Sequence, residues 1–270
     1  MSAEARLYLD LMKKCLTNTI YGNAEYVKVS SNGFIKRIIV QLFGSAGITL
    51  VRTNTYSHQA RESGLDWPPY AHTMIGLRRL NNIQACVEEI LETNVRGDLI
   101  ETGVWRGGAA IFMRAILRAY SVVDRYVWAA DSFEGLPAPN DVEYPADKGD
   151  LHHTVRQLAV SIDEVKENFK RYDLLDDQVR FLKGWFRDTL PHAEIKQLAL
   201  IRLDGDMYES TMDALVSLYP KLSVGGYIIV DDWGSVDASR RAIEDYRLIH
   251  KIADEILPID GIGVYWKRSA

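Results

Sequence analysis

The chain has 270 residues, which is enough for one large α/β domain with an added segment, and its 47% hydrophobic and 26% charged content is ordinary for a soluble globular protein. Its net charge of −5, with scattered lysines and arginines, argues against nucleic-acid binding. The N-terminus lacks a secretory apolar region, and the most apolar stretch, residues 38–51, is too short to span a membrane. Since Cys15 and Cys86 lie in apolar helical patterns, we expect free thiols in a reducing, cytoplasmic compartment and no membrane span.

Residues 1–70 are predicted to form an N-terminal extension that precedes the main domain, residues 71–270. Residues 3–16 carry apolar side chains at helical spacing and predict an amphipathic helix. Residues 17–29 have the composition of a turn-rich connection, whereas residues 36–51 are apolar without a clear period. Because such a patch is unfavourable in water, we expect a lid or a contact between subunits, with a surface-lying membrane segment as the weaker alternative.

From residue 73 onward the chain alternates between helices and strands. Thr73 is a candidate cap for a helix that reaches about residue 94. Residues 134–160 form a long loop, and loops of that length are usually functional or disordered. The order of elements predicts an α/β fold: a mostly parallel sheet with helices on both faces and one antiparallel strand at the end. Strands are predicted at 99–101, 126–130, 179–182, 198–203 and 227–230, helices at 109–120, 161–172, 208–220 and 238–250, and a hairpin at 255–259 and 264–267.

Acidic residues follow two strands that are joined by a single helical crossover. Asp204 and Asp206 follow the first strand, and Asp231 and Asp232 follow the second. A parallel crossover places both loops at the carboxyl edge of the sheet, where open α/β sheets bind ligands. Helix capping explains one or two of these residues but not four. Because clustered carboxylates repel one another, a hard divalent cation is the usual partner, and the pattern predicts a metal site.

Residues 101–108, Glu-Thr-Gly-Val-Trp-Arg-Gly-Gly, follow the first core strand and open a helix. Gly103 and Gly108 fit the ends of a dinucleotide fingerprint, but Trp105 replaces its middle glycine. A large side chain there blocks the pyrophosphate, which disfavours NAD and leaves an NAD-dependent oxidoreductase as a weak alternative. A nucleoside without phosphates still fits.

Two further positions strengthen the hypothesis of a nucleoside site. Asp131 ends the second core strand, where a carboxylate can accept hydrogen bonds from both ribose hydroxyls, although it could instead cap residues 133–136. Gly184 and Trp185 follow the third strand at the same edge, and Trp185 packs either on a purine or in the core. The glycine loop, the acid and the acidic strand ends together describe an S-adenosylmethionine site.

Six segments carry a resemblance to the macrocin O-methyltransferase (TylF-type) family: 66–76, 101–108, 131–137, 184–191, 203–213 and 224–233. The chain is similar to the family from about residue 60 to the C-terminus and over residues 1–22, whereas residues 27–58 fit no pattern. The resemblance implies a class I methyltransferase (Rossmann-like) fold with a seven-stranded sheet. It also implies transfer of a methyl group from S-adenosylmethionine, with Mg²⁺, to a deoxysugar hydroxyl on an antibiotic glycoside. S-adenosylhomocysteine is then the product, and the expected assembly is a homo-oligomer, commonly a dimer.

The resemblance also assigns roles by position. It implies Asp204, Asp231 and Asp232 as metal ligands and Asp206 as the general base; related enzymes place lysine or histidine one residue later, where this chain has Met207. The implied cofactor-binding residues are Thr73, Met74, Glu101, Thr102, Gly103, Trp105, Gly108, Ala109, Asp131, Ser132, Gly184 and Trp185.

Other interpretations stay open at this point. The same metal site suits the vicinal oxygens of a phenol or catechol, and a non-catalytic scaffold is a weaker alternative because it has no use for clustered carboxylates. His152 and His153 in the long loop are alternative bases, although loop histidines are more often solvent-exposed. His72 precedes Thr73 and Met74 and is either a helix-start contact or part of the cofactor site.

Overall fold

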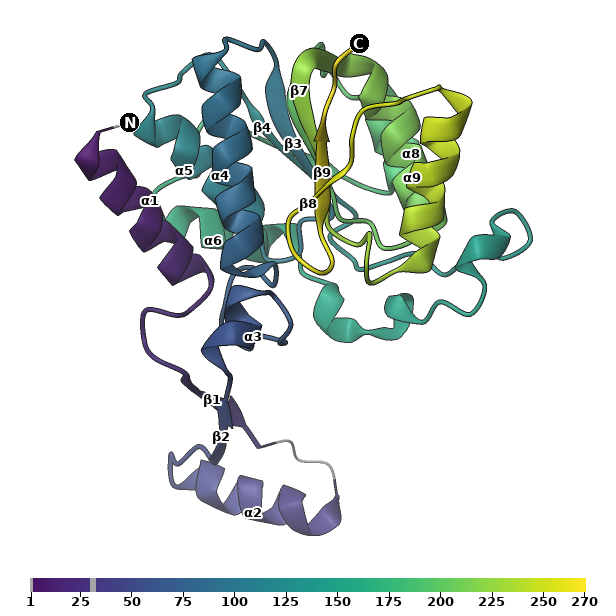
Figure 1. Cartoon of the computed structure of the whole chain (residues 1–270). Coiled ribbons are helices and arrows are strands. Elements are labelled where there is room, and N and C mark those ends of the chain that lie inside the picture. The colour runs from purple at the N-terminus through teal and green to yellow at the C-terminus, as the bar shows by residue number, and fades with distance from the viewer. Residues whose placement is uncertain (1, 30–32) are drawn as a thin grey trace.

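The computed structural model describes residues 2–29 and 33–270, and its centre is a seven-stranded sheet (Figure 1). The strand order is β5-β4-β3-β6-β7-β9-β8. β5, β4, β3, β6 and β7 run parallel, and β9 runs antiparallel to both of its neighbours. This arrangement confirms the predicted α/β class and the antiparallel strand near the end. The strands are β3 (Asp98–Thr102), β4 (Val127–Asp131), β5 (Val179–Lys183), β6 (Leu198–Leu203), β7 (Leu222–Val230), β8 (Leu257–Pro258) and β9 (Val264–Lys267).

Helices cover both faces of the sheet, and each face has its own hydrophobic core. On one face, the apolar sides of α1 (Ala3–Leu16), α4 (Gly76–Glu92), α5 (Gly108–Ala119) and α6 (Ile162–Arg171) pack together with buried side chains such as Leu9. On the other face, α8 (Tyr208–Leu218) and α9 (Asp237–Ile249) pack side by side, with the short α7 (Phe186–Thr189) beside them. Helices α1, α4, α6, α8 and α9 each bury one side, whereas α5 is buried almost all round, with ten of its twelve residues buried.

The strand order reverses between β3 and β6. From β3 the chain adds β4 and then β5 on one side, and from β6 it adds β7 on the other. At such a reversal the two loops that leave the carboxyl ends of the central strands diverge, and a crevice opens between them. The acidic ends of β6 and β7 and the glycine loop after β3 meet at this crevice.

A narrow arm projects from the body of the molecule (Figure 1). Strands β1 (Ala24–Lys28) and β2 (Val51–Thr55) pair antiparallel, and helix α2 (Phe34–Ser45) lies at the far end. No residue of α2 is buried, and Phe34 and Leu42 are 81% and 69% exposed. α3 (His58–Glu62) leads back to the body, where buried Arg61 pairs with Glu25 at 3.1 Å. Because α1 packs against α5, the arm that stands away from the body consists, among the described residues, of β1, α2 and β2 with their connections rather than of the whole N-terminal segment.

Three local predictions were wrong. Residues 17–29 contain strand β1 in addition to turns. Thr73 does not cap α4, which begins at Gly76; its Oγ1 accepts a 3.4 Å hydrogen bond from the N–H of Ile75. The strand predicted at 227–230 begins earlier, at Leu222, so that β7 includes Gly225, and a short 3₁₀ turn at Tyr219–Lys221 separates it from α8.

The long loop after β4 contains three short 3₁₀ helices: η1 (Pro145–Asp147), η2 (His152–Thr154) and η3 (Arg156–Leu158). Asp147 in η1 accepts hydrogen bonds from the N–H groups of Tyr208 and Glu209, at 2.6 and 3.0 Å. The loop therefore caps the start of α8 and is fixed beside the acidic end of β6. No helix within residues 2–29 and 33–270 is long and apolar enough to cross a membrane.

Candidate active site

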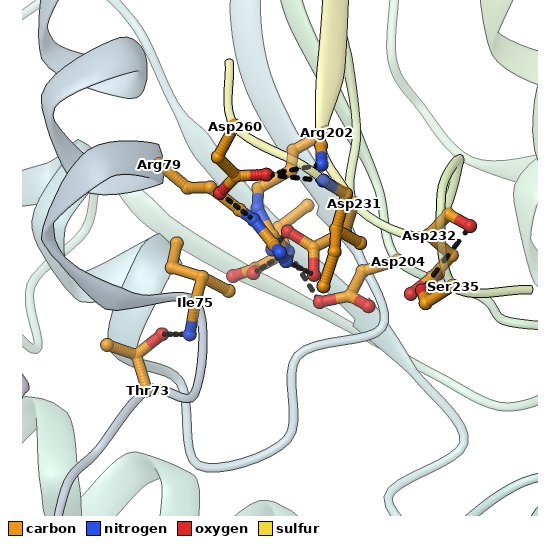
Figure 2. Close-up of polar contacts among 12 residues, drawn as sticks. Thr73, Ile75, Arg79, Arg202, Asp204, Asp231, Asp232, Ser235 and Asp260 are labelled. Atoms are coloured by element: carbon orange, nitrogen blue, oxygen red, sulfur yellow. Dashed lines mark hydrogen bonds and ion pairs between the residues drawn. The ribbon is translucent and has the colours of Figure 1, made fainter. Parts of the chain in front are cut away.

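Three of the four clustered carboxylates meet at the ends of β6 and β7. One oxygen from each of Asp204, Asp231 and Asp232 lies within 4.8 Å of the others. The pairing of the strands explains the cluster: Leu203 lies opposite Val230, so the residues that follow them leave the sheet side by side. Figure 2 shows the three carboxylates together with the arginines that hold two of them.

Arg202 lies beneath this cluster on β6 and is completely buried. Its Nη1 donates to Glu101 Oε1 and to Asp204 Oδ2, both at 2.8 Å, and its Nη2 donates to Asp231 Oδ1. One guanidinium therefore links the carboxyl ends of β3, β6 and β7. Its positive charge offsets part of the repulsion among the acidic residues, since an opposite charge at this distance favours the ionised carboxylate.

Arg79 on helix α4 holds the other side of Asp231. Its Nη1 donates to Asp231 Oδ2 at 2.6 Å, and its Nε donates to Asp260 Oδ2 at 2.9 Å (Figure 2). Both oxygens of Asp231 are thus bonded to arginines. In contrast, Asp204 Oδ1 and Asp232 Oδ1 accept no hydrogen bond from the described part of the chain.

The donor set fits a hard divalent cation. Carboxylate oxygens are the ligands that Mg²⁺ prefers, and the two oxygens without hydrogen bonds belong to residues of the triad. No cysteine or histidine belongs to the triad, which disfavours a soft metal. The arginines leave a net negative charge for a cation to neutralise, because they are two positive groups among the carboxylates of Glu101, Asp204, Asp231, Asp232 and Asp260.

The electrostatics of the site reflect this excess of negative charge. Burial, together with the neighbouring charge of Asp231, raises the pKa of Asp204 to about 7. Burial, reinforced by Asp206 and Asp204, raises the pKa of Asp232 well above its ordinary value. Burial raises the pKa of Glu101 to about 8, although Arg202 opposes the shift. A cation bound to the triad lowers the pKa values of Asp204 and Asp232 again, because it stabilises the ionised forms.

Asp206 lies two residues after Asp204, in the loop that follows β6. Its backbone φ of 56° is left-handed, a conformation that aspartate tolerates better than most residues, and its N–H donates to Asp232 Oδ2 at 3.2 Å. Burial raises the pKa of Asp206 to about 6, although His152 opposes the shift. The next residue, Met207, is fully buried. Asp206 therefore lies at the site, whereas Met207 packs in the core.

Two adjoining hollows contain most of the predicted cofactor-binding residues. Gly103, Trp105, Asp131, Ser132, Gly184 and Trp185 line the first, which also reaches Asp204 and Asp206. Thr73, Met74, Glu101 and Ala109 line the second, together with Arg79 and Asp231. Trp105 and Asp204 line both hollows. Three of the predicted cofactor- and metal-binding residues line neither hollow: Thr102, Gly108 and Asp232.

The hollows have features that fit a nucleoside joined to an amino acid. Glu101 Oε2 is buried in the second hollow and has no hydrogen-bond partner among the described residues, so it can accept a bond from an amino group. In the first hollow, Asp131 Oδ2 accepts from the N–H of Val104 at 2.7 Å, and Oδ1 accepts from the N–H of Phe133 at 2.6 Å. The Asp131 carboxylate therefore fixes the glycine loop and the turn after β4. Its Oδ1 also accepts from the hydroxyl of Ser132 at 3.4 Å, so the second lone pair of Oδ2 is the one left for a ligand.

The two glycines of the loop also have a role in the fold itself. A Cβ on Gly103 would lie 1.7 Å from the carbonyl oxygen of Asp204, and a Cβ on Gly108 would lie 2.4 Å from that of His72. Between them, Trp105 has a left-handed φ of 47°, and its Nε1 donates to the carbonyl of Gln157 at 2.9 Å. The loop is therefore held against both the acidic strand end and the long loop after β4.

The histidines lie at the edges of this arrangement. His152 Nδ1 is 2.6 Å from Asp150 Oδ2, and its pKa is raised because the charges of Asp206 and Asp150 outweigh the opposing effect of burial. His72 lines the second hollow, its ring contacts the hydroxyl of Tyr172 at 2.6 Å, and its carbonyl accepts a hydrogen bond from the N–H of Gly108, the first residue of α5, at 2.9 Å, so it makes a helix-start contact as well as lining the hollow. Burial lowers the pKa of His72 to about 4, which makes it a neutral group.

Sequence analysis missed the two arginines and Asp260. A local signal for Arg202 existed: it interrupts an apolar strand whose six residues are all buried, and a buried arginine requires acidic partners. Arg79 and Asp260 carried no such signal, because they lie 152 and 29 residues from Asp231 along the chain and meet it only in the fold.

Comparisons with known proteins agree with this geometry. A model of the family described as Macrocin-O-methyltransferase (TylF) matches residues 5–268. The chain is 50% identical over 269 residues to demethyldecarbamoylnovobiocin O-methyltransferase of Streptomyces niveus, covering 99% of this chain and 95% of that protein. It is 51% identical over 272 residues to 8-demethyl-8-(2,3-dimethoxy-alpha-L-rhamnosyl)-tetracenomycin-C 4'-O-methyltransferase of Streptomyces olivaceus, covering 100% and 96%. The solved structure of the O-methyltransferase NovP matches with a TM-score of 0.86 at 49% identity, covering 98% of this chain and 100% of that one.

Proposed function

Because the chain belongs to the macrocin O-methyltransferase (TylF) family and is therefore an O-methyltransferase, we propose that it transfers a methyl group from S-adenosylmethionine to a sugar hydroxyl of a glycosylated natural product, with Mg²⁺. The sugar acceptor is supported by the name of the Streptomyces olivaceus relative, which specifies a rhamnosyl group. Mg²⁺ is supported by the triad of Asp204, Asp231 and Asp232, and this triad is the observation that carries the proposal.

The proposed roles follow the two hollows. Asp131, Ser132, Gly184 and Trp185 bind the nucleoside, while Thr73, Met74 and Glu101 bind the amino-acid end. Trp105 lines both hollows and would contact a ligand that occupied the two together. When bound, S-adenosylmethionine would supply the electrophilic methyl group. Thr102, Gly103, Gly108 and Ala109 shape the backbone on either side of Trp105.

The acceptor hydroxyl is activated at the acidic end of β6. Asp206 lines the first hollow with Asp204, and its pKa of about 6, raised by burial, lets it take a proton near neutral pH. When bound by the triad, Mg²⁺ supplies positive charge beside the oxygen that loses its proton. The walls of the hollow orient the hydroxyl toward the methyl group and exclude water, which supplies part of the rate by positioning alone.

We further propose that the arm within residues 1–70 contacts a second copy of the chain. Helix α2 exposes Phe34, Ile35, Ile38 and Leu42 at the end of a hairpin that stands away from the body. Apolar side chains gathered in this way mark an interaction surface in most proteins. A homodimer covers them, and the 71–270 domain then carries the chemistry.

The test is a methylation assay with a panel of acceptors. Purified protein is incubated with S-adenosylmethionine and deoxysugar glycosides, and mass spectrometry measures the addition of one methyl group, with and without Mg²⁺. The panel includes phenols and catechols, because the metal triad suits their vicinal oxygens equally well. Methylation of a glycoside that depends on Mg²⁺ supports the proposal, whereas methylation of catechols alone contradicts the sugar acceptor.

A further inference from the structure

Arg79 is a buried arginine that joins three distant parts of the chain: helix α4, the end of β7 and the C-terminal hairpin. Arg79 bonds to Asp231 and Asp260, and Asp260 is itself held in place. Its Oδ1 accepts from the N–H groups of Ile262 and Gly263 at 2.8 and 2.7 Å. The carboxylate of Asp260 is therefore fixed by its own turn before it reaches the arginine (Figure 2).

The surroundings restrict the side chain of Arg79 through its Nε and Nη1, while Nη2 is buried without a hydrogen-bond partner among the described residues. Its side chain is 5% exposed and that of Asp260 is 3% exposed, so water does not compete for their bond. Gly263 leaves the space that the arginine occupies: a Cβ there would lie 3.2 Å from Arg79 Nε and 3.3 Å from its Cδ. Arg79 is thus packed and hydrogen-bonded on the side that faces away from the metal triad.

From this geometry we infer that Arg79 is a positioning residue for Asp231. Arg202 holds Asp231 Oδ1 and Arg79 holds Oδ2, and two bonds from opposite sides fix the plane of the carboxylate. Asp260 and Gly263 influence Asp231 indirectly, because they hold Arg79 in place. The inference rests on the proposed metal site, since the orientation of Asp231 matters only if the triad binds a cation.

Charge and position have opposite effects at this residue, which makes the inference testable. If Arg79 acted only through its charge, its removal would tighten cation binding, because a positive group repels a cation. If it acts by positioning, its removal weakens binding. Arg79→Lys keeps the charge, but an ammonium cannot hold Asp231 and Asp260 in the fork geometry of a guanidinium. Gly263→Ala changes no charge and only crowds the arginine.

The experiment is a titration of the full-length protein with Mn²⁺, followed by electron paramagnetic resonance of the free ion. Variants are Arg79→Met, Arg79→Lys and Gly263→Ala. The control is Arg114→Lys, which alters a buried arginine paired with Asp176 at 2.6 Å, away from the triad.

We expect Arg79→Met and Arg79→Lys to raise the Kd for Mn²⁺ about 10–100-fold, the usual effect of losing a partner of a metal ligand. Gly263→Ala should raise it by a smaller factor, and Arg114→Lys should leave it unchanged. Steady-state kinetics should show that excess Mg²⁺ recovers part of kcat in Arg79→Lys.

The outcomes distinguish a failure of the proposed metal triad from a failure of the inferred role of Arg79. Tighter Mn²⁺ binding in Arg79→Met, with unchanged binding in Arg79→Lys and Gly263→Ala, means that Arg79 acts by charge alone and overturns the inference. If the wild-type protein itself binds no Mn²⁺, the metal triad is wrong, and the inference is lost with it. Gly263→Ala keeps the test informative if Arg79→Met does not fold, because it leaves every charged group in place.

Discussion

Replacement of Arg202 is the perturbation with the largest expected effect on the fold. Arg202→Met keeps the length and apolar stem of the side chain but removes the only group that bonds Glu101, Asp204 and Asp231 together in the described structure. Removing one partner of a buried ionic network typically costs about 3–5 kcal/mol, because the remaining charges stay buried without compensation. At about 2–4 °C per kcal/mol for a chain of this size, the melting temperature should fall by about 6–20 °C.

The loss should depend on pH in a definite direction. Burial already raises the pKa of Glu101 to about 8 and that of Asp204 to about 7, and loss of the arginine raises both further. A carboxyl whose pKa is higher in the folded state holds its proton in the fold after the unfolded chain has released it. Folding stability therefore falls as pH rises from about 4 through the raised pKa values. The variant should be destabilised more at pH 8 than at pH 5.5.

Differential scanning fluorimetry at both pH values, with and without Mg²⁺, measures this effect. We expect Mg²⁺ to restore part of the loss at pH 8, because a cation on the triad replaces some of the missing charge. The matched control is Arg114→Met, whose loss should not respond to Mg²⁺, since its partner Asp176 lies outside the triad. A melting temperature within about 3 °C of wild type, or an equal loss at both pH values, would refute the reasoning.

Three further predictions concern the proposed site and the arm. Asp204→Asn should raise the Mg²⁺ concentration that half-maximal activity requires, whereas Asp206→Asn should keep that concentration and lose about 10²–10⁴-fold in kcat, the usual contribution of a positioned base; titrations of the initial rate that give equal Mg²⁺ dependence in both variants would remove Asp206 from its role. Asp131→Ala should weaken the rise in melting temperature that S-adenosylhomocysteine produces, because a ligand stabilises only the state that binds it; unchanged affinity by calorimetry would move the ribose contact elsewhere. The double change Ile38→Asp and Leu42→Asp should convert a dimer to a monomer in light scattering, and a wild-type chain that is monomeric at every concentration contradicts the contact.

The core of the fold was predictable because its signals are local. β6 is an apolar run whose residues are all buried, and the acids that follow it mark the strand end directly. Ser161 stands three residues before Glu164, which is the spacing of a capping motif, and in the structure its Oγ accepts from the N–H of Glu164 at 3.3 Å at the start of α6. Such patterns need no knowledge of distant residues, so the succession of strands and helices, and the placement of the acidic loops at the carboxyl edge of the sheet, followed from them.

The arm was not predictable by the same means. In β1 the one buried position is held by the charged Glu25, and β2 has four exposed residues and one intermediate one, so neither strand shows the apolar alternation that predicts a half-buried strand. The feature that holds the arm to the body, Arg61 paired with Glu25, joins residues 36 positions apart. A side chain that is buried by such a pair looks like any surface charge in the sequence.

The pattern of acidic residues in the sequence did not reveal all of the charged groups at the site. Four carboxylates at two strand ends pointed to a cation, yet two of the cations at the site belong to the protein itself: Arg202 and Arg79. Counting Glu101 and Asp260, five carboxylates (Asp204, Asp231 and Asp232 among them) surround these two arginines, and five minus two leaves a formal charge of −3. The raised pKa values of Asp204 and Asp232, caused by burial and by their acidic neighbours, mean that protons neutralise part of that charge when no metal is bound. We therefore expect the fold to form without the ion, and a divalent cation that enters the triad to displace those protons. Cation affinity should accordingly rise with pH through neutrality, and methyl transfer should require the ion while folding does not.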